Sequence, residues 1–369
     1  MLRKVMATTA VALAASVSVA AAADLSQMSW GEIVAQAKEE GEVTWYVWYL
    51  RDELSGAVSA FEEEYGIKVT IPEGTNGANQ EKLLAEKDRE TGDIDVMAFG
   101  VDTVKKWDLE GLFSPLTVLL PDTDGRRQEV LGINGEGYAL PYWGNQTGIA
   151  YDPEFVPEDA LPQDAGSLAA FMEANPERFG FNADKGWAGR SWVISIYRDL
   201  SDADFADGSL GDERVASLTA GTEWLQSHGE QYVVTTSNAD SITRISDREL
   251  WMAPAYEDHL AGMQNRGEAR KEIRFYIPEM GMAGGGNMVA VPQNAPHPAA
   301  AVVFANWLTS AETQTMFNRD FGTAPMHEMA DDSMALVPND QRDRQIGWAH
   351  GDFLNVMMDQ FTEEVLLNR

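Results

Sequence analysis

The chain has 369 residues, of which 59 are acidic and 27 are lysine or arginine, and its net charge is −32. A surface this acidic repels phosphate groups, which argues against nucleic acid and anionic membranes as partners. The chain has no cysteine, so it has no thiol for a disulfide or for a lipid anchor. The acidity fits two interpretations, a solvated surface adapted to a salty habitat or the steering of a cationic ligand.

The first 23 residues have the pattern of an export signal. Arg3 and Lys4 precede an apolar stretch over 5–20, and Ala21-Ala22-Ala23 fits a cleavage site. The stretch is too short and too rich in alanine to span a membrane comfortably. We therefore expect cleavage after Ala23 and a monomeric, freely diffusing periplasmic protein without a membrane anchor. The mature chain is long enough for two domains.

The first half of the mature chain alternates predicted strands and helices. The strands are expected at 43–50, 67–71 and 94–99, and the helices at 54–65, 78–90 and 102–109, the last one capped by Asp102. This order favours a parallel sheet with helices on its faces, in which ligands lie beyond the carboxyl ends of the strands. The loops at these ends supply six candidate ligand residues: Trp48, Tyr49, Thr75, Asn76, Gly100 and Asp102.

A second α/β region follows two short extended segments that flank 141–144. Its predicted helices cover 167–174, 190–200, 213–228 and 256–266, and its strands 232–235 and 251–255. The glycine-rich segment 281–286 suits a hinge or a close approach of backbone to ligand. Helices are expected at 298–318 and 352–367, and Thr309 to Glu312 fits a capping box that starts a helix.

Three segments carry a resemblance to a known family. The run APHPAAAVVFANWLTSAETQ at 295–314 resembles a segment of bacterial extracellular solute-binding proteins, the ligand receptors of ABC importers. The run PYWGNQTGIAY at 141–151 is similar to the lobe crossover of polyamine-binding receptors. The opening SWGEIVAQAKEEGEVTWYVWY at 29–49 resembles the start of receptors for thiamine-type uptake. The resemblance implies an α/β, two-lobed periplasmic-binding-protein fold of type II, with the ligand in a cleft between lobes and a membrane permease as partner.

The same resemblance implies a domain division. Lobe 1 is expected to comprise 24–140 and 287–325, and lobe 2 to comprise 145–276. The hinge is expected at 141–144 and 277–286, and a C-terminal helical segment at 326–369.

The candidate ligand residues combine aromatic rings with polar groups. Besides the six loop residues above, they are Trp143, Asn145, Gln146, Arg190, Ser191, Trp192, Tyr256, Glu257 and Asn287. Aromatic rings with an acid suit an organic cation, whereas amides and hydroxyls suit a polyol or sugar. Each tryptophan has packing in a core as its alternative. We expect a thiamine-like or other organic cation first and a polyol or sugar second.

Several other functions lack their motifs. Polyamine is less favoured, because polyamine receptors carry a tryptophan closely followed by an acid where this chain has Pro254 and then Tyr256-Glu257. Iron-binding receptors of this kind use two adjacent tyrosines, and this chain has no Tyr-Tyr pair. Its five histidines lack metal-ligand spacing. No nucleophile, P-loop or zinc-protease motif is present, so neither an enzyme nor a cofactor is expected. A secreted hydrolase remains a rival that would need paired acids in the cleft.

Overall fold

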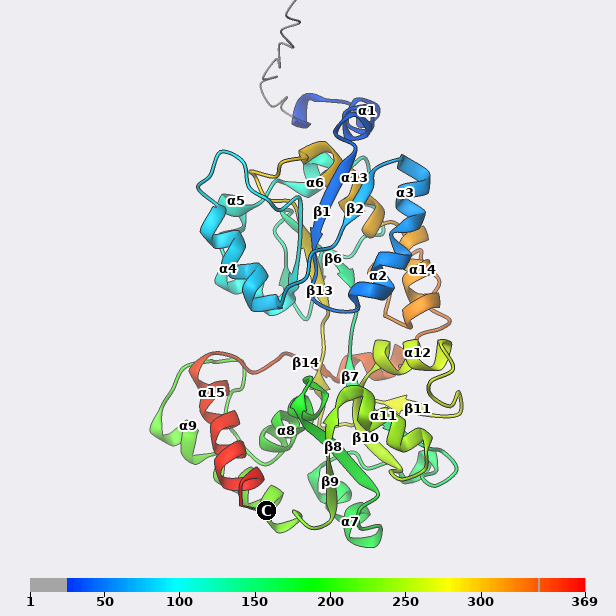
Figure 1. The fold of residues 1–369 in the computed structure, drawn as a ribbon. Helices are drawn as coiled ribbons and strands as arrows, with labels where there is room; N and C mark the ends of the chain where they lie inside the picture. Colours follow the sequence, from blue (N-terminus) through cyan, green and yellow to red (C-terminus); the bar gives the residue numbers. More distant parts are fainter. Residues whose placement is uncertain (1–24, 338, 369) are drawn as a thin grey trace, which may run out of the picture.

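The computed structural model describes residues 25–337 and 339–368, so the expected signal sequence lies outside the described residues. The chain forms two lobes, drawn one above the other in Figure 1. Each lobe contains a five-stranded sheet, of order β2-β1-β3-β13-β6 in the first and β11-β7-β10-β8-β9 in the second. Helices flank both sheets, which confirms the predicted two-lobed α/β fold.

The first sheet is parallel at one edge and antiparallel at the other. Its strands are β1 (Glu42–Tyr46), β2 (Lys68–Thr70), β3 (Val96–Gly100), β6 (Ala139–Trp143) and β13 (Asn287–Ala290). β1 pairs in parallel with β2 and β3, and β13 returns from late in the chain to lie antiparallel between β3 and β6. The first predicted strand was too long, because β1 ends at Tyr46. Trp48 and Tyr49 therefore both lie beyond the strand, half-buried.

Lobe 1 is completed by the helices α1 (Trp30–Glu40), α2 (Arg51–Ala57), α3 (Ser59–Tyr65), α4 (Asn76–Glu86), α5 (Leu109–Leu112), α6 (Leu116–Leu119), α13 (Pro298–Leu308) and α14 (Ala311–Phe321), with 3₁₀ turns η1 (Leu25–Gln27) and η2 (Val101–Lys106). The core of this lobe is aromatic. Trp45 of β1 packs edge-on against Phe304 of α13, with ring centroids 5.4 Å apart, and Phe304 also contacts Phe61 of α3. The late helices 298–321 thus belong to the first lobe.

Two predicted helix caps were wrong. Ser310, not Thr309, caps α14, because its hydroxyl accepts a hydrogen bond from the Thr313 amide at 3.2 Å. Thr309 instead ends α13 and donates its hydroxyl to the Ala305 carbonyl. Asp102 lies inside η2, and the cap of the following helix α5 is Asp108.

Lobe 2 contains β7 (Thr147–Tyr151), β8 (Phe179–Lys185), β9 (Tyr232–Ser237), β10 (Met252–Tyr256) and β11 (Arg274–Tyr276), with helices α7 (Ala165–Ala174), α8 (Ala188–Asp199), α9 (Asp212–Ala216), α10 (Thr219–Ser227), α11 (Asn238–Ser246) and α12 (Glu257–Asn265). A 3₁₀ turn, η3 (Glu158–Ala160), precedes α7. The first lobe also contains a small hairpin, formed by β4 (Glu129–Val130) and β5 (Ile133–Asn134). Strand β8 and helix α11 were not predicted.

The chain passes between the lobes three times. The first passage joins β6 to β7, and the second joins β12 (Met282–Ala283) to β13. The third leaves α14 in lobe 1 and reaches η4 (Asn339–Arg344) and β14 (Gln345–Ile346), which pairs with β12. The predicted C-terminal helical segment, 326–369, was therefore wrong for 326–337, where no helix occurs.

The end of the chain belongs to lobe 2. Helix α15 (Gly351–Gln360) continues into a π-helical turn, η5 (Phe361–Leu366). Phe353, Met357 and Phe361 are buried in the core of the second lobe. Figure 1 shows α15 running toward the outer end of that lobe.

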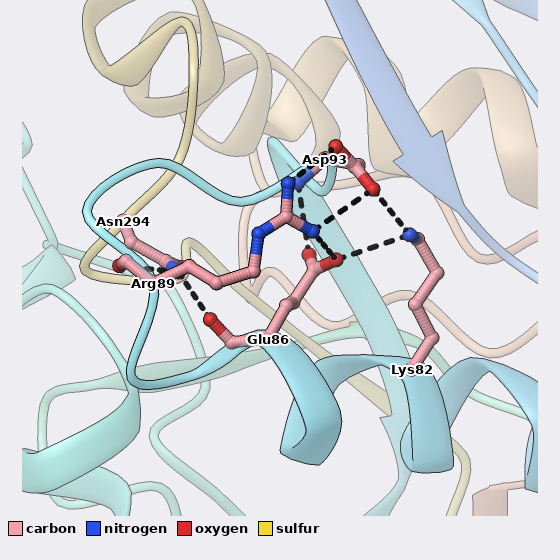
Figure 2. A network of polar contacts seen from close by, with 5 residues as sticks. All are labelled: Lys82, Glu86, Arg89, Asp93 and Asn294. Carbon is pink, nitrogen blue, oxygen red and sulfur yellow. Dashed lines mark hydrogen bonds and ion pairs between the residues drawn. The ribbon is translucent and has the colours of Figure 1, made fainter.

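A buried carboxylate ties three segments of lobe 1 together (Figure 2). Glu86 at the end of α4 accepts from Lys82 Nζ at 3.0 Å, from Arg89 at 3.3 Å and from the Asp93 amide at 2.9 Å. Its own carbonyl accepts from the Asn294 amide group at 2.8 Å. Hydrogen bonds from Lys82 and then Arg89 lower the pKa of Asp93 to about 2. The network thus fixes the loops before β3 and before α13.

We expect Glu86→Ala to lower the free energy of unfolding by about 2–3 kcal/mol, because it leaves the partners of a buried carboxylate unsatisfied. Glu86→Gln should lose less, since its carbonyl oxygen can still accept from the Asp93 amide. Urea denaturation checks this, with the exposed Glu90→Ala as the control. Equal stability of the Glu86→Ala and Glu90→Ala proteins would contradict a structural role for the network.

Candidate functional site

A cavity of about 750 Å³ lies between the lobes. Its lobe 1 wall is formed by segments that follow β1 and β3 and by the start of α4: Trp48, Tyr49, Thr75, Asn76, Gly77, Gly100, Val101, Asp102 and Lys106. Its lobe 2 wall includes Gly186, Trp187, Asn238, Tyr256, Asp258 and His259. Asn145, Gly286 and Asn287 of the chain crossings line it too, and the C-terminal segment adds Trp348, Ala349, His350, Gly351, Leu354 and Asn355. Such a volume suits a small organic molecule.

The structure brings nine of the fifteen candidate ligand residues to this cleft: Trp48, Tyr49, Thr75, Asn76, Gly100, Asp102, Asn145, Tyr256 and Asn287. Most of them follow a predicted strand, and the carboxyl ends of parallel strands meet at one edge of the sheet. The start of β13 reaches the same edge, because Asn287 pairs with Gly100. Asp102 forms an ion pair with Lys106 at 3.3 Å.

Trp143 lies behind the wall of the cleft. Its side chain is fully buried, and its ring packs against Tyr49, Phe317 and Phe321. Its indole nitrogen donates a hydrogen bond to Oδ2 of Asp258 at 3.1 Å. The expectation that Trp143 lines the cleft therefore differs from the structure, because the end of β6 turns this ring into the interface between the lobes.

Gln146 and Ser191 hold the chain crossings together. Gln146 is fully buried, donates to the Met282 carbonyl at 3.0 Å, and lies directly over Gly284 of the second crossing. Ser191 accepts from the Ala283 amide at 3.1 Å, and its hydroxyl lies 2.6 Å from that of Thr147. These polar groups were expected in the cleft, but their hydrogen bonds join β7, α8 and β12.

Arg190 and Trp192 also lie outside the cleft. Trp192 is fully buried between Phe179 and Phe181 of β8, because helix α8 is covered on nearly all sides. Arg190 stacks over the Trp187 ring, with its guanidinium carbon 4.8 Å from the centroid. Trp187 is the residue of this group that reaches the cleft, 41% exposed and edge-on to Trp348.

Glu257 points away from the cleft. It is fully buried and forms a two-pronged ion pair with Arg342 of the third crossing, at 3.1 and 3.0 Å. Burial raises the pKa of Glu257 to about 7, and Arg342 opposes that rise. The carboxylate on the lobe 2 wall of the cleft is the next residue, Asp258, which is only 3% exposed.

The predicted ligand residue Glu257 lies one position before Asp258, the carboxylate that lines the cleft. Since Glu257 is the first residue of α12, side chains at successive positions point in different directions, and Tyr256 and Asp258 face the cleft while Glu257 does not. Trp348, His350 and Asn355 had no signal, because they reach the cleft only through the third crossing. Trp187 follows β8, a strand that was not predicted, whereas Asn238 directly follows β9, whose predicted strand ended too early, at 235.

Asp258 is a buried carboxylate that forms no ion pair within the described chain. Its two oxygens accept from the Trp143 indole at 3.1 Å and from the His259 amide at 2.9 Å. The negative charge of Asp258 contributes to the raised pKa of Tyr256, although burial of the phenol is the larger cause. An anionic group therefore lies among aromatic rings, and no lysine, arginine or histidine of the described residues forms an ion pair with it.

In the part of the chain that the structure describes, no three histidine, aspartate or glutamate side chains are grouped so that they could hold a metal ion. Likewise, none of the described helices combines the length and apolarity needed to cross a membrane.

Two α/β lobes joined by three chain crossings, with an aromatic and polar cleft between them, define a two-lobed solute receptor. The chain belongs to the bacterial extracellular solute-binding protein family, whose model matches residues 56–341. Family membership confirms the resemblance found in the sequence. It makes the chain the substrate-binding component of an ABC transport system, with a small-molecule ligand and a permease partner.

Solved structures share the fold at low sequence identity. The GacH receptor of Streptomyces glaucescens, determined alone and with acarbose, is 15% identical over 89% of this chain and 94% of its own, with a TM-score of 0.67. The spermidine/putrescine substrate-binding protein PotD of Streptococcus pneumoniae is 13% identical over 89% and 99%, with a TM-score of 0.63. Iron-bound HitA of Pseudomonas aeruginosa is 17% identical over 89% and 99%, with a TM-score of 0.59. No curated protein sequence matches the chain.

Proposed function

We propose that this protein captures an organic cation, thiamine-like in combining a positive charge with a flat ring, and delivers it to an ABC importer. The observation that carries the proposal is Asp258, a cleft carboxylate that forms no ion pair with any described residue. A buried carboxylate is unfavourable unless it is paired, and a cationic ligand would supply the missing charge.

The aromatic lining supports the same ligand class. Trp48, Tyr49 and Tyr256 line the cleft together with Asp258, and Trp187 and Trp348 add two further rings. A desolvated cation over such a ring gains about 2 kcal/mol, and a flat ring stacks on it as well. A long polyamine is less favoured, because the other cleft aspartate, Asp102, is already paired with Lys106.

A polyol or sugar is the second candidate, and the amide side chains favour it. The cleft contains Asn76, Asn145, Asn238, Asn287 and Asn355. Amides donate and accept at once, as hydroxyl groups require, and sugars also stack on aromatic rings. A sugar would leave the charge of Asp258 unpaired, which is why we place this candidate second.

A thermal-shift screen of the mature protein against organic cations, polyols, sugars and carboxylates tests the proposal. A ligand at 100 times its dissociation constant should add about 2.7 kcal/mol to the free energy of unfolding. We expect thiamine or another aromatic cation to give the largest shift. A screen in which only neutral sugars stabilise the protein would contradict the cation proposal and support the polyol.

We propose a monomeric periplasmic receptor that performs no catalysis and uses no cofactor. Closure of the lobes around the ligand would present the closed form to the permease. The hinge would be 141–144 and 277–286, and the third crossing would have to move with them. Gly286 suits this place, because its φ of 93° and its contact with the Trp143 carbonyl leave no room for a side chain.

Cleavage of the export signal predicts the mass of the mature chain. We expect intact-mass analysis of the periplasmic fraction to find a chain that begins at Asp24, since Ala21 to Ala23 fits the cleavage site. Recovery of a chain that retains residues 1–23, or recovery in membranes alone, would contradict this.

A further inference from the structure

One buried hydrogen bond joins the two lobes directly behind the cleft. Trp143 ends β6 of lobe 1, and Asp258 lies in the first turn of α12 of lobe 2. The indole nitrogen lies 3.1 Å from Oδ2 of the carboxylate, and the two residues are 0% and 3% exposed. Because the bond lies at the junction, its geometry depends on how the lobes are placed.

The donor in this bond is held rigidly. The Trp143 ring packs between Tyr49, Phe317 and Phe321, with centroids 5.3, 5.2 and 5.1 Å away. Phe317 and Phe321 belong to α14, which also binds α12 through hydrogen bonds from Asn265 to the carbonyls of Arg319 and Asp320. Figure 1 shows α12 and α14 facing each other across the junction of the lobes. The indole N–H therefore has one direction in which to donate.

The Asp258 carboxylate can still accept hydrogen bonds from a ligand. A carboxylate has about four lone-pair sites, and those of Asp258 accept only two hydrogen bonds in the described chain, one on each oxygen. The residue lines the cleft, so free lone pairs are available to a bound molecule. A group that hydrogen-bonds a charged side chain from behind fixes its rotamer and orientation.

We propose that Trp143 of lobe 1 is a positioning residue for the ligand. Its indole N–H donates a hydrogen bond that orients the Asp258 carboxylate of lobe 2 toward the cationic group of the ligand. This inference rests on the proposed function that the ligand is a cation. It gives Trp143 a role without ligand contact, in place of ring stacking. It also means that the cation and the lobe junction depend on the same carboxylate.

Calorimetric titration of four proteins tests the inference: the wild type, Trp143→Phe, Asp258→Asn and the double variant. The titrant is thiamine, followed by choline and spermidine. Trp143→Phe keeps an aromatic ring but lacks the N–H, and we expect about tenfold weaker binding, as for the loss of one hydrogen bond to a charged group. Asp258→Asn should lose about 100-fold. The double variant should bind like Asp258→Asn, because Trp143 acts through that carboxylate.

Two further proteins separate positioning from general damage. Trp107→Phe replaces a half-buried tryptophan elsewhere in lobe 1 and should leave binding unchanged. Asp258→Glu keeps the charge but displaces it, and it should lose most of the affinity if orientation matters. If Trp143→Phe fails to fold, the test compares the indole ¹⁵N–¹H resonance of Trp143 between the wild type and Asp258→Asn. We expect this resonance to shift more than those of the other tryptophans.

The outcomes distinguish the inference from the proposed function. Wild-type affinity in Trp143→Phe, additive losses in the double variant, or an unmoved indole resonance would overturn the positioning role while the cation proposal stands. Wild-type affinity in Asp258→Asn, or no binding by any of the three cations, would overturn both. Loss of binding in Trp143→Phe and Asp258→Glu, with a non-additive double variant, supports the inference.

Discussion

Asp258→Asn is expected to weaken binding of the cationic ligand by about 2.7 kcal/mol, or roughly 100-fold, while the ligand-free protein gains or keeps stability. The variant removes the one cleft carboxylate that forms no ion pair in the described chain, so a bound cation loses its counter-charge. Without ligand, the same change removes an unpaired buried charge, which relieves a desolvation penalty. Calorimetry and urea unfolding measure the two effects separately.

Asp102→Asn is the matched control for this prediction. Its carboxylate also lines the cleft, but it is about one-third exposed and already paired with Lys106. We expect a loss of affinity well below that of Asp258→Asn. Equal losses in the two variants would indicate that the overall acidity of the cleft, and not Asp258 itself, attracts the ligand.

Arg342→Met is expected to lower the free energy of unfolding by about 3–5 kcal/mol at pH 8, because it leaves the buried carboxylate of Glu257 without its partner. The defect should shrink at pH 5. Burial raises the pKa of Glu257 in the folded wild-type protein to about 7, above its ordinary value of 4.5, and removal of Arg342 raises it further. At pH 5 the folded variant therefore binds a proton on Glu257 and needs no counter-charge.

The sign of the pH dependence follows from the same shift. An acid whose folded pKa exceeds its unfolded pKa binds more protons in the folded state, so stability falls as pH rises between the two values. For Glu257 that window is about pH 4.5 to 7 in the wild type and extends upward in Arg342→Met. Urea unfolding at pH 5 and pH 8 checks the prediction. A loss of stability in Arg342→Met that is the same at both pH values would contradict it.

A double variant isolates the ion pair. Glu257→Gln with Arg342→Met removes both charges, and it should recover much of the stability lost in Arg342→Met alone. Both residues lie outside the cleft wall defined by Trp48, Tyr256 and Asp258. The double variant should therefore retain most of the affinity for ligand, unlike Asp258→Asn.

The sequence predicted the first lobe well for a physical reason. Its strands and helices alternate with clear periodicity, and in such a sheet the loops after the strands must meet at one edge. Trp48, Asn76 and Gly100 could therefore be assigned to one cleft although they lie far apart along the chain. The predicted strand ran too far at its end, yet the residues beyond it still reached the cleft.

The second lobe was harder to predict, because single-residue register decides which side chain faces the ligand. Glu257 and Asp258 are adjacent, and only the start of α12 determines which one enters the cleft. Trp187 and Trp192 both lie near the start of α8, but that helix is buried on nearly all sides, so Trp192 packs in the core. Periodicity alone could not separate these pairs.

Long-range contacts account for the remaining differences. Gln146 and Ser191 are polar residues near the crossings, as ligand residues would be, but they bind the backbone of 282–283 from a distant part of the chain. Trp348 and His350 enter the cleft because the third crossing pairs β14 with β12. The sequence carries no local sign of either arrangement.

The fold by itself does not identify the ligand. The proteins that share it at 13–17% identity include a receptor solved with acarbose, a spermidine/putrescine substrate-binding protein and an iron-bound protein. Ligand chemistry therefore has to be argued from the cleft of this chain, in which Asp258 is the feature that separates a cation from a sugar.

A crystal structure of the mature protein with the cation selected by the thermal-shift screen tests the central claim most directly. We predict a closed cleft in which the cationic nitrogen lies within about 4 Å of the Asp258 carboxylate, with the Trp143 indole still bonded to the other side of that carboxylate. A ligand bound outside the cleft, or one that places only hydroxyl groups at Asp258, would contradict the claim.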